Sequence, residues 1–282
     1  MIETLGFLNQ LQDKANGAAA PSVSPSLGEI DKVSSVRQMP MEELAPEALS
    51  RIAYQRDPTG LAADRFRYLR MRLEELWKGG KLKKLLITSP LPQDGKSTLA
   101  LNLATALTAH GHNSVLLVEA DLYHPTLIEL LELESGPGLA ECLTCSVNPL
   151  STVRRIGPLG WYLLPAGKPP ENPAELLHGE AFSKVMHTLA PHFDWILIDS
   201  PPITLLTDAL ALARHADGTL LVVRAGQTSR DAVDSAVKSL GPKTLIGVVL
   251  NGVNGLERRY SKYYGSYRKP PANQLRTGTP TR

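Results

Sequence analysis

The sequence lacks several features that would place it in a specialised class of proteins. The sequence of 282 residues has only two cysteines and a net charge of +2. It contains no apolar run near the roughly 18 to 20 residues that a membrane span needs. Residues 1–17 also lack the basic start and apolar block of a secretory signal peptide. These absences exclude a disulfide framework and predict a cytoplasmic globular protein, unless a partner tethers it to a membrane.

The two cysteines, Cys142 and Cys145, form a C-x-x-C pattern, which occurs in redox centres and in halves of zinc sites. A zinc site needs a second pair or suitably spaced histidines, and the sequence supplies neither. The pair falls in a predicted helix over 139–144, where a buried cysteine is common, so a structural role is favoured and redox chemistry is the alternative.

One stretch, residues 85–107, reads as a strand, a phosphate-binding loop and a helix: L-L-I-T-S-P-L-P-Q-D-G-K-S-T-L-A-L-N-L-A-T-A-L. The first amides of a helix have no internal partners and lie at the positive end of its dipole, so they bind anions. Gly95 allows close approach of the backbone to phosphates, Lys96 is suited to the β- and γ-phosphates, and Ser97 to Mg²⁺. A chance G-K-S-T is the alternative, which the flanking strand and helix disfavour, although Pro90 stands where the usual pattern begins with glycine.

Two further apolar strands are followed by acidic residues. The first, over 115–118, leads into Glu119 and Asp121, and the second, over 196–198, leads into Asp199. In a parallel sheet ligands lie outside the carboxyl ends of the strands, so these carboxylates are expected near the phosphates, where Asp commonly binds Mg²⁺. A lone Asp after a strand is often only a turn former, but two beside a phosphate loop favour a metal site.

The remaining strands are predicted at 218–223 and 245–250, with helices at 208–214 and 230–240. Strands that alternate with helices predict an α/β fold with a mostly parallel sheet and helices on both faces. Asn251 follows the last strand on the ligand side, so it is a candidate for reading the adenine edge; a turn before Gly252 explains it equally well.

Three regions follow from composition. Residues 1–57 are predicted to be a flexible segment with a short helix over 1–14, residues 58–255 a P-loop domain, and residues 256–282 a basic tail. The tail has seven Lys or Arg against one Glu, so its charge is +6 and that of the rest is −4. It also contains four of the eight tyrosines, which core packing does not explain: Tyr260, Tyr263, Tyr264 and Tyr267.

A helix is predicted over 60–78, with Asp64, Arg67 and Arg70 three residues apart on one broad face. From spacing alone, a solvated and salt-bridged face is the favoured interpretation.

Taken together, residues 58–268 resemble the bacterial tyrosine kinases of capsule and exopolysaccharide assembly (BY-kinases), which are deviant P-loop ATPases related to the partition ATPases. In that family the phosphate loop reads S-x-x-P-G-E-G-K-S-T, similar to S-P-L-P-Q-D-G-K-S-T here. The family loops D-x-D-x-R-x-P and I-I-D-x-P-P resemble E-A-D-L-Y-H-P and I-D-S-P-P, and L-P-A-G-K-P-P-E-N-P-A-E-L-L resembles G-x-x-P-P-N-P-x-E-L-L.

The resemblance implies an ATP-dependent autokinase that phosphorylates the tyrosine tail of a neighbouring copy and regulates exopolysaccharide or capsule polymerisation and export. For such a reaction we predict Lys96, Asp121 and Asp199 as catalytic residues, with Asp121 as the proton acceptor and Glu119 as its alternate, and Mg²⁺ at Ser97, Asp121 and Asp199. The nucleotide-binding residues are then Gln93, Asp94, Gly95, Lys96, Ser97, Thr98 and Asn251, and the phospho-acceptors are Tyr260, Tyr263, Tyr264 and Tyr267.

The resemblance also implies partners. Asp64, Arg67 and Arg70 match the family's E-x-x-R-x-x-R element, through which subunits assemble into a ring, and this favours an interface over a solvated face. A membrane-anchored activator of the chain-length-determinant type would recruit the protein to the inner face of the cell membrane, and a protein-tyrosine phosphatase would oppose it.

Four positions depart from the family pattern. Gln93 replaces a glycine, which puts local backbone strain at issue, and Glu119 replaces the first Asp of the second loop. Tyr123 stands where the family has Arg, and Asp64 shortens the acid of the assembly helix. These changes affect the expected rate and ring stability more than nucleotide binding.

Two other functions compete with this one. A partition-type P-loop ATPase would hydrolyse ATP without modifying tyrosine, but many such proteins carry a lysine where this loop has Leu91. A nucleic-acid-binding module would use the Arg, Lys and Tyr of the tail to stack on bases; the modest charge and the lack of a basic stripe inside the domain argue against it, so no nucleic-acid partner is expected.

Overall fold

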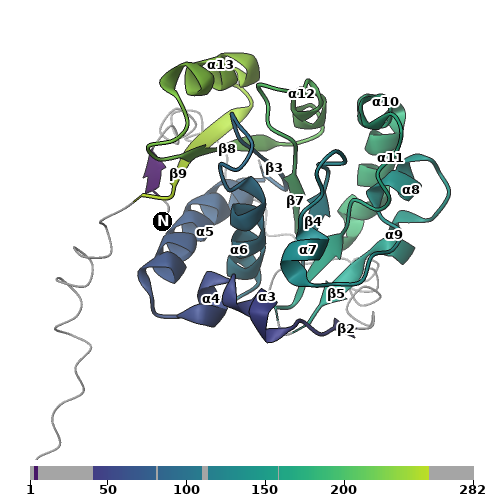
Figure 1. The fold of residues 1–282 in the computed structure, drawn as a ribbon, viewed down its shortest axis with the longest axis horizontal. Helices are drawn as coiled ribbons and strands as arrows, with labels where there is room; N and C mark the ends of the chain where they lie inside the picture. The colour runs from purple at the N-terminus through teal and green to yellow at the C-terminus, as the bar shows by residue number, and fades with distance from the viewer. Residues whose placement is uncertain (1–2, 6–40, 81, 110–113, 158, 254–282) are drawn as a thin grey trace, which may run out of the picture.

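The computed structural model describes residues 3–5, 41–80, 82–109, 114–157 and 159–253. Their strands form a single sheet in the order β1-β9-β8-β3-β7-β4-β6-β5-β2 (Figure 1). Strands β9, β8, β3, β7, β4 and β6 run parallel. The edges are mixed, since β1 pairs antiparallel with β9 and β5 pairs antiparallel with β6. The strands are β1 Glu3–Leu5, β2 Met41–Glu42, β3 Lys84–Thr88, β4 Val115–Glu119, β5 Arg154–Ile156, β6 Trp161–Leu164, β7 Trp195–Asp199, β8 Gly218–Arg224 and β9 Leu245–Asn251.

Helices cover both faces of this sheet. They are α3 Pro46–Ser50, α4 Ala53–Arg56, α5 Leu61–Lys78, α6 Lys96–Thr108, α7 Leu127–Leu131, α8 Leu139–Leu143, α9 Pro149–Thr152, α10 Pro173–His178, α11 Glu180–Leu189, α12 Asp208–Ala213 and α13 Arg230–Leu240, with a 3-10 turn at Ala190–His192. The prediction of a mostly parallel sheet with helices on both faces is confirmed.

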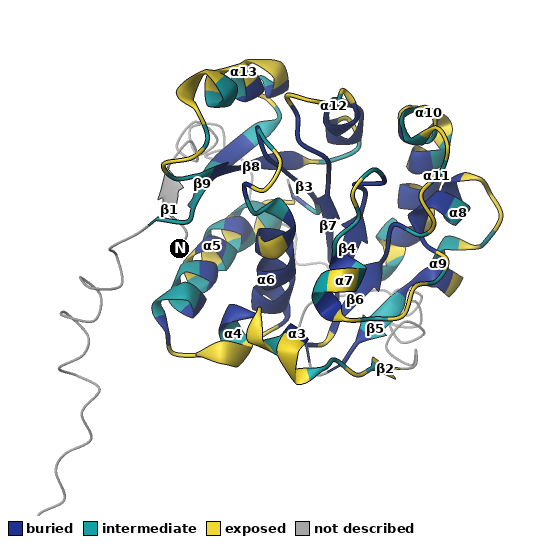
Figure 2. Cartoon of the chain, viewed as in Figure 1, coloured by how far each residue is buried: buried dark blue, intermediate teal, exposed yellow. Residues whose placement is uncertain are grey.

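Two hydrophobic cores hold the layers together because side chains alternate along each strand. Along β3, Leu85 and Ile87 join the core under α4 to α7, whereas Leu86 joins the core under α8 and α10 to α13. The central strands β4 and β7 are therefore buried along their whole length, and β3 from Leu85 onward (Figure 2). Sheets covered on both faces require near-continuous apolar strands, which is the pattern that the sequence has.

The segment before residue 58 differs from the expected flexible segment with an N-terminal helix. Residues 3–5 form a strand, and residues 41–57 form β2, α3 and α4, which pack on the domain. Ile52 is fully buried, and the amide of Ala53 donates to Asn102 Oδ1 at 2.6 Å. One large apolar side chain and one buried hydrogen bond thus fix a segment whose composition suggested a tether; residues 6–40 lie outside the described residues.

Cys142 is buried in α8, where its sulfur lies 3.3 Å from Thr152 Oγ1, and Cys145 is exposed. Within the described part of the chain, no helix is both long and apolar enough to cross a membrane.

Candidate active site

The phosphate loop connects β3 to α6, residues 89–95. Gly95 caps the helix with φ +96°, a left-handed conformation that glycine adopts at no steric cost. Carbonyl groups of the loop are tied to the segment after β7, because Ile203 N donates to Ser89 O at 2.9 Å and the Thr204 hydroxyl donates to Pro90 O. The loop is therefore held from a neighbouring strand end, with the N-terminus of α6 at its base.

Lys96 and Asp121 form a buried ion pair beside this helix terminus. Lys96 Nζ lies 3.0 Å from Asp121 Oδ2, and their side chains are 12% and 4% exposed. Burial works against the charge of Lys96, but Asp199 and Asp121 outweigh it, so the pKa of Lys96 is raised. The lysine is thus a fixed cation at neutral pH, held where the loop meets the end of β4.

Asp199 ends β7 next to β4, where it is paired in register with Glu119. It is 1% exposed, and neither carboxylate oxygen has a hydrogen-bond partner among the described residues. Burial raises the pKa of Asp199 to about 6, against the opposing charge of Lys96. A buried carboxylate beside the Ser97 hydroxyl of the first helical turn fits a hard divalent cation such as Mg²⁺.

Glu119, the alternate proton acceptor in the prediction, makes three hydrogen bonds to the backbone. Its Oε1 accepts from the amides of Thr126 and Leu127, both at 2.6 Å, and its Oε2 accepts from the amide of Ala166 at 3.1 Å. Burial raises its pKa, although these three bonds oppose the shift. The carboxylate is therefore occupied in shaping the loop after β4, and Asp121 is the carboxylate that faces Lys96.

Asn251 contacts the phosphate loop. Its Nδ2 donates to Asp94 O at 3.0 Å and lies 2.1 Å from the point where a Cβ on residue 95 would be. In this arrangement its amide braces the loop, and Asn251 also lines a small hollow of about 180 Å³ together with Thr98. The other polar residues of that hollow are Arg51, Arg56, Arg65 and Asn102.

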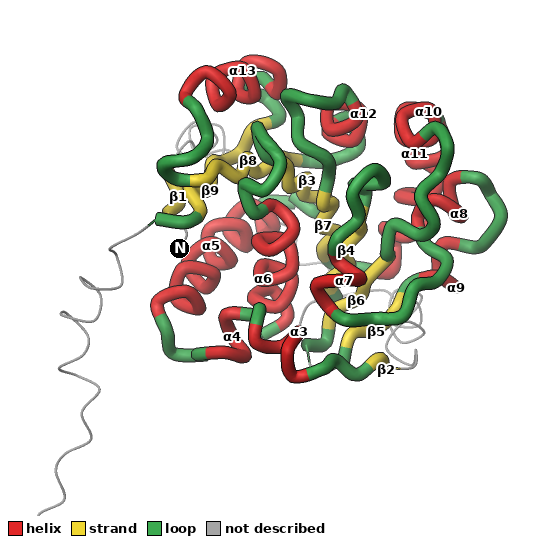
Figure 3. Tube along the Cα trace, in the orientation of Figure 1, coloured by secondary structure: helices red, strands yellow, loops and turns green. Residues whose placement is uncertain are grey.

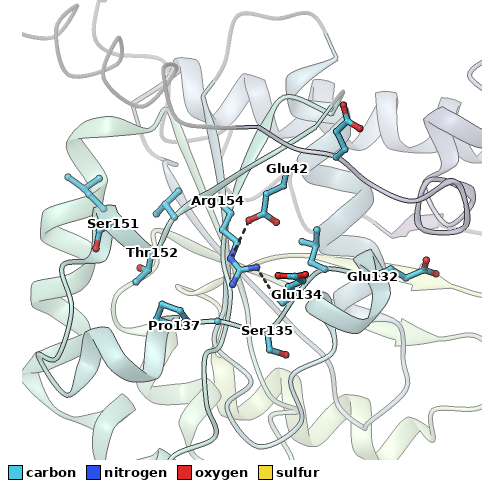
Figure 4. Close-up of a pocket in the computed structure, with 13 residues that line it drawn as sticks. Glu42, Glu132, Glu134, Ser135, Pro137, Ser151, Thr152 and Arg154 are labelled. Atoms are coloured by element: carbon cyan, nitrogen blue, oxygen red, sulfur yellow. Dashed lines mark hydrogen bonds and ion pairs between the residues drawn. The ribbon is translucent and has the colours of Figure 1, made fainter.

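A second and larger cavity, of about 860 Å³, lies elsewhere, at the β2 and β5 edge of the sheet. Figure 4 shows Arg154 between Glu42 and Glu134: its Nε lies 3.7 Å from Glu42 Oε1, and its Nη1 donates to the Glu134 carbonyl at 2.6 Å. This cavity contains none of the residues of the phosphate loop, so its size does not identify the active site.

The three assembly-helix residues lie on α5 and make contacts within the chain. Arg67 donates to Asp64 and to the Pro58 carbonyl, and its guanidinium lies 5.3 Å from the centre of the Tyr54 ring. Arg70 Nη1 donates to Ala106 O at 3.4 Å. The structure therefore places both arginines on the body of the domain, at the edge of an outer face that exposes Tyr68 and Met71.

Two other predicted features concern tyrosines. Tyr260, Tyr263, Tyr264 and Tyr267 lie outside the described residues. Tyr123, in the loop after β4, has its pKa raised by burial and by the Asp208 carboxylate, so the place of the family's cation is taken by a neutral group.

Sequence reasoning missed three side chains that contact the phosphate loop. One is Thr204, described above, whose hydroxyl donates to Pro90 O. The other two are Arg224, whose Nη1 donates to Gln93 O at 2.9 Å, and Thr228, whose Oγ1 donates to Asp94 Oδ1 at 2.7 Å. All three follow an apolar strand on the ligand side of the sheet, and this position was their only sequence signal.

No protein-family profile matches the chain. The chain is 31% identical over 212 residues to the tyrosine-protein kinase YwqD of Bacillus subtilis, covering 74% of this chain and 89% of that protein. It is 32% identical to the tyrosine-protein kinase wzc of Salmonella typhimurium, over 75% of this chain but only 29% of that protein. Among solved structures, the kinase domain of the Escherichia coli tyrosine kinase ETK is 26% identical, with a TM-score of 0.69 over 77% of this chain and 83% of that chain.

These similarities agree with the site. The loops that surround Lys96, Asp121 and Asp199 are those on which the sequence resemblance rests, and the relatives are named tyrosine-protein kinases, which favours a kinase over a partition ATPase. The extent of the match to YwqD shows that the chain belongs to the family of bacterial tyrosine-protein kinases.

Proposed function

We propose that the protein is an ATP-dependent tyrosine autokinase that transfers the γ-phosphoryl group of ATP to the tail tyrosines of a neighbouring copy. The observation that carries this proposal is the buried group of Lys96, Asp121 and Asp199 at the N-terminus of α6. A cation, a helix terminus and an unpartnered carboxylate together suit a triphosphate with its metal ion.

In this proposal the amides of residues 94–98 and the Lys96 ammonium bind the phosphates. Ser97 and Asp199, with Asp121, hold Mg²⁺, which neutralises charge on the phosphate oxygens when it is bound. The hollow beside Thr98 and Asn251 suits the nucleoside end of ATP, because it adjoins the loop and offers amide and guanidinium groups.

Asp121 orients the attacking tyrosine hydroxyl and accepts its proton. Tyrosine titrates near pH 10, so its oxygen needs a proton acceptor during transfer, although the loose transition state does not demand a strong base. Asp121 suits this role because Oδ2 faces Lys96, while Oδ1 accepts from the amide of His124 at 3.1 Å and so fixes the carboxylate. Glu119 suits this role less well because its carboxylate already accepts three amide hydrogen bonds.

The experiment that tests the proposal is phosphotyrosine mapping by mass spectrometry after incubation of the purified protein with Mg-ATP. Phosphate is expected on Tyr260, Tyr263, Tyr264 or Tyr267, and a variant with all four changed to Phe is the matched control. Release of ADP without any phosphotyrosine would instead identify a partition-type ATPase.

Assembly of copies is part of the proposal, since a tail tyrosine must reach another copy's active site. Arg67→Glu is expected to shift the protein to smaller species in sedimentation velocity and to lower tail phosphotyrosine about tenfold, because it reverses a charge on the proposed assembly face of α5. Within the chain it also places a carboxylate beside Asp64 and removes the donor to the Pro58 carbonyl. Lys78→Glu, at the far end of the same helix, is the control. An unchanged sedimentation profile for Arg67→Glu would contradict a role for this helix in assembly.

The charge of the tail gives phosphorylation a way to regulate the protein. Each phosphate adds about −1.5 to −2 charges to a tail of +6, so a few additions reverse its sign and weaken its attraction to the acidic residues of a neighbouring site. We further propose the partners of the BY-kinase type: a membrane-anchored activator that recruits the protein to the inner face of the membrane, an opposing phosphatase, and a role in exopolysaccharide or capsule export.

A further inference from the structure

The phosphate loop contains a residue in an unfavourable backbone conformation. Gln93 has φ +63°, in the left-handed region that residues with a Cβ seldom occupy. It stands directly before Asp94 and Gly95, in the part of the loop that turns toward the helix. Contacts with other residues must therefore stabilise the left-handed conformation of Gln93.

The turn after β8 provides these contacts. The Arg224 guanidinium donates to the Gln93 carbonyl at 2.9 Å, and Thr228 Oγ1, which accepts from the amide of Arg224 at 2.9 Å, donates to Asp94. The other carboxylate oxygen of Asp94 accepts from the amide of Leu91 at 3.0 Å. The loop between β3 and α6 and the turn after β8 thus lie side by side and are joined by these bonds (Figure 3).

The carbonyl groups of residues 93 and 94 both have donors outside the loop, Arg224 for the first and Asn251 for the second. In an anion-binding loop the amides must converge on the ligand, and this requires the carbonyls to point away from it. Donors that hold the carbonyls outward therefore keep the amides arranged for phosphate before the nucleotide arrives.

We infer that Arg224 is a positioning residue for the phosphate loop, which acts through the Gln93 carbonyl by holding residue 93 in its left-handed conformation. The inference rests on the proposal that this loop binds ATP. Its chemistry is a charge-assisted hydrogen bond to a carbonyl, and it involves no contact between Arg224 and the nucleotide. Arg224 is needed here because residue 93 is not glycine.

A double-mutant cycle tests this, with the dissociation constant of Mg-ATP measured by calorimetry on the full chain. Arg224→Ala is expected to weaken binding about tenfold, the loss of one charge-assisted hydrogen bond. In the Gln93→Gly background the same change is expected to weaken binding less than about threefold, because glycine adopts the left-handed conformation unaided. Arg230→Ala, six residues along the chain, is the control and should leave the affinity unchanged.

Equal weakening by Arg224→Ala in both backgrounds would overturn the inference, since it would mean that Arg224 acts on the nucleotide directly or on the fold in general. No weakening in either background would also overturn it. Should Arg224→Ala unfold, Arg224→Lys takes its place, with a smaller loss that Gln93→Gly again reduces. In steady-state assays the defect is expected in the KM for ATP more than in kcat. A wild-type chain that does not bind Mg-ATP would refute the proposed function itself, which is a distinguishable result.

Discussion

Replacing Lys96 with methionine is expected to abolish phosphotyrosine in the C-terminal tail, with a loss of at least about 100-fold in the rate of phosphorylation. The reason is the position of the ammonium group, 3.0 Å from Asp121 and 12% exposed, at the base of the phosphate loop. Methionine has a similar length but no charge, so charge that develops on the transferred group would lose its nearest fixed cation. Phosphotyrosine is measured by mass spectrometry after incubation with Mg-ATP.

The control for this experiment is Lys184→Met, because the side chain of Lys184 is 74% exposed on α11 and away from the loop. Lys96→Arg is a second variant, which keeps the charge that Asp121 needs as a partner and so separates a loss of catalysis from a loss of folding. If the tail of the Lys96→Met variant contains as much phosphotyrosine as that of the wild type, the kinase proposal is wrong.

Replacing Asp199 with asparagine is expected to stop phosphoryl transfer and, at the same time, to stabilise the protein without nucleotide. Its carboxyl has a pKa of about 6 in the fold against an ordinary value of 3.8, so ionisation at neutral pH costs the folded state up to about 3 kcal/mol. Asparagine is neutral at every pH and removes this cost, but it gives Mg²⁺ a weaker ligand. Denaturant unfolding and the phosphotyrosine assay measure the two effects.

The stabilisation expected from Asp199→Asn depends on pH. Below about pH 4 the Asp199 carboxyl is protonated in both the folded and the unfolded state, so it does not change the free energy of unfolding. Between about pH 4 and 6 it ionises in the unfolded chain but not yet in the folded protein, so the stability of the wild type falls as pH rises. Above about pH 6 this loss of stability is complete. The difference in unfolding free energy between Asp199→Asn and the wild type should therefore grow across this window and then level off. A difference that does not change with pH would contradict the raised pKa.

The central sheet could be predicted closely from sequence, and the physical reason is burial on two faces. Strands such as β4 and β7 are uniform apolar runs that end in an acidic residue, so both their bounds and their polar ends are visible. The strands β6, β5 and β2 on one side of the sheet were not predicted. β6, Trp161–Leu164, is only four residues long, and β2 and β5 consist largely of charged or half-buried residues whose pairing depends on the rest of the fold.

The site was only partly predictable for a related reason. Lys96, Asp121 and Asp199 belong to spaced motifs, and the parallel sheet brings them together. Arg224 and Thr228 belong to no motif, and their role exists only because the turn after β8 lies against the phosphate loop. The amide partners of Glu119 are seven to 47 residues away along the chain, so its structural function could not be read from local sequence.

The contact between Gly95 and Asn251 has a consequence for how this sequence can diverge. A Cβ on residue 95 would meet the Asn251 amide at 2.1 Å, and φ at Gly95 is +96°. A side chain at position 95 is therefore opposed both by its own backbone and by a residue 156 positions away. Over evolutionary time the two positions are expected to be inherited as a pair: a lineage that shortens residue 251 gains room at position 95 but loses the donor to the Asp94 carbonyl.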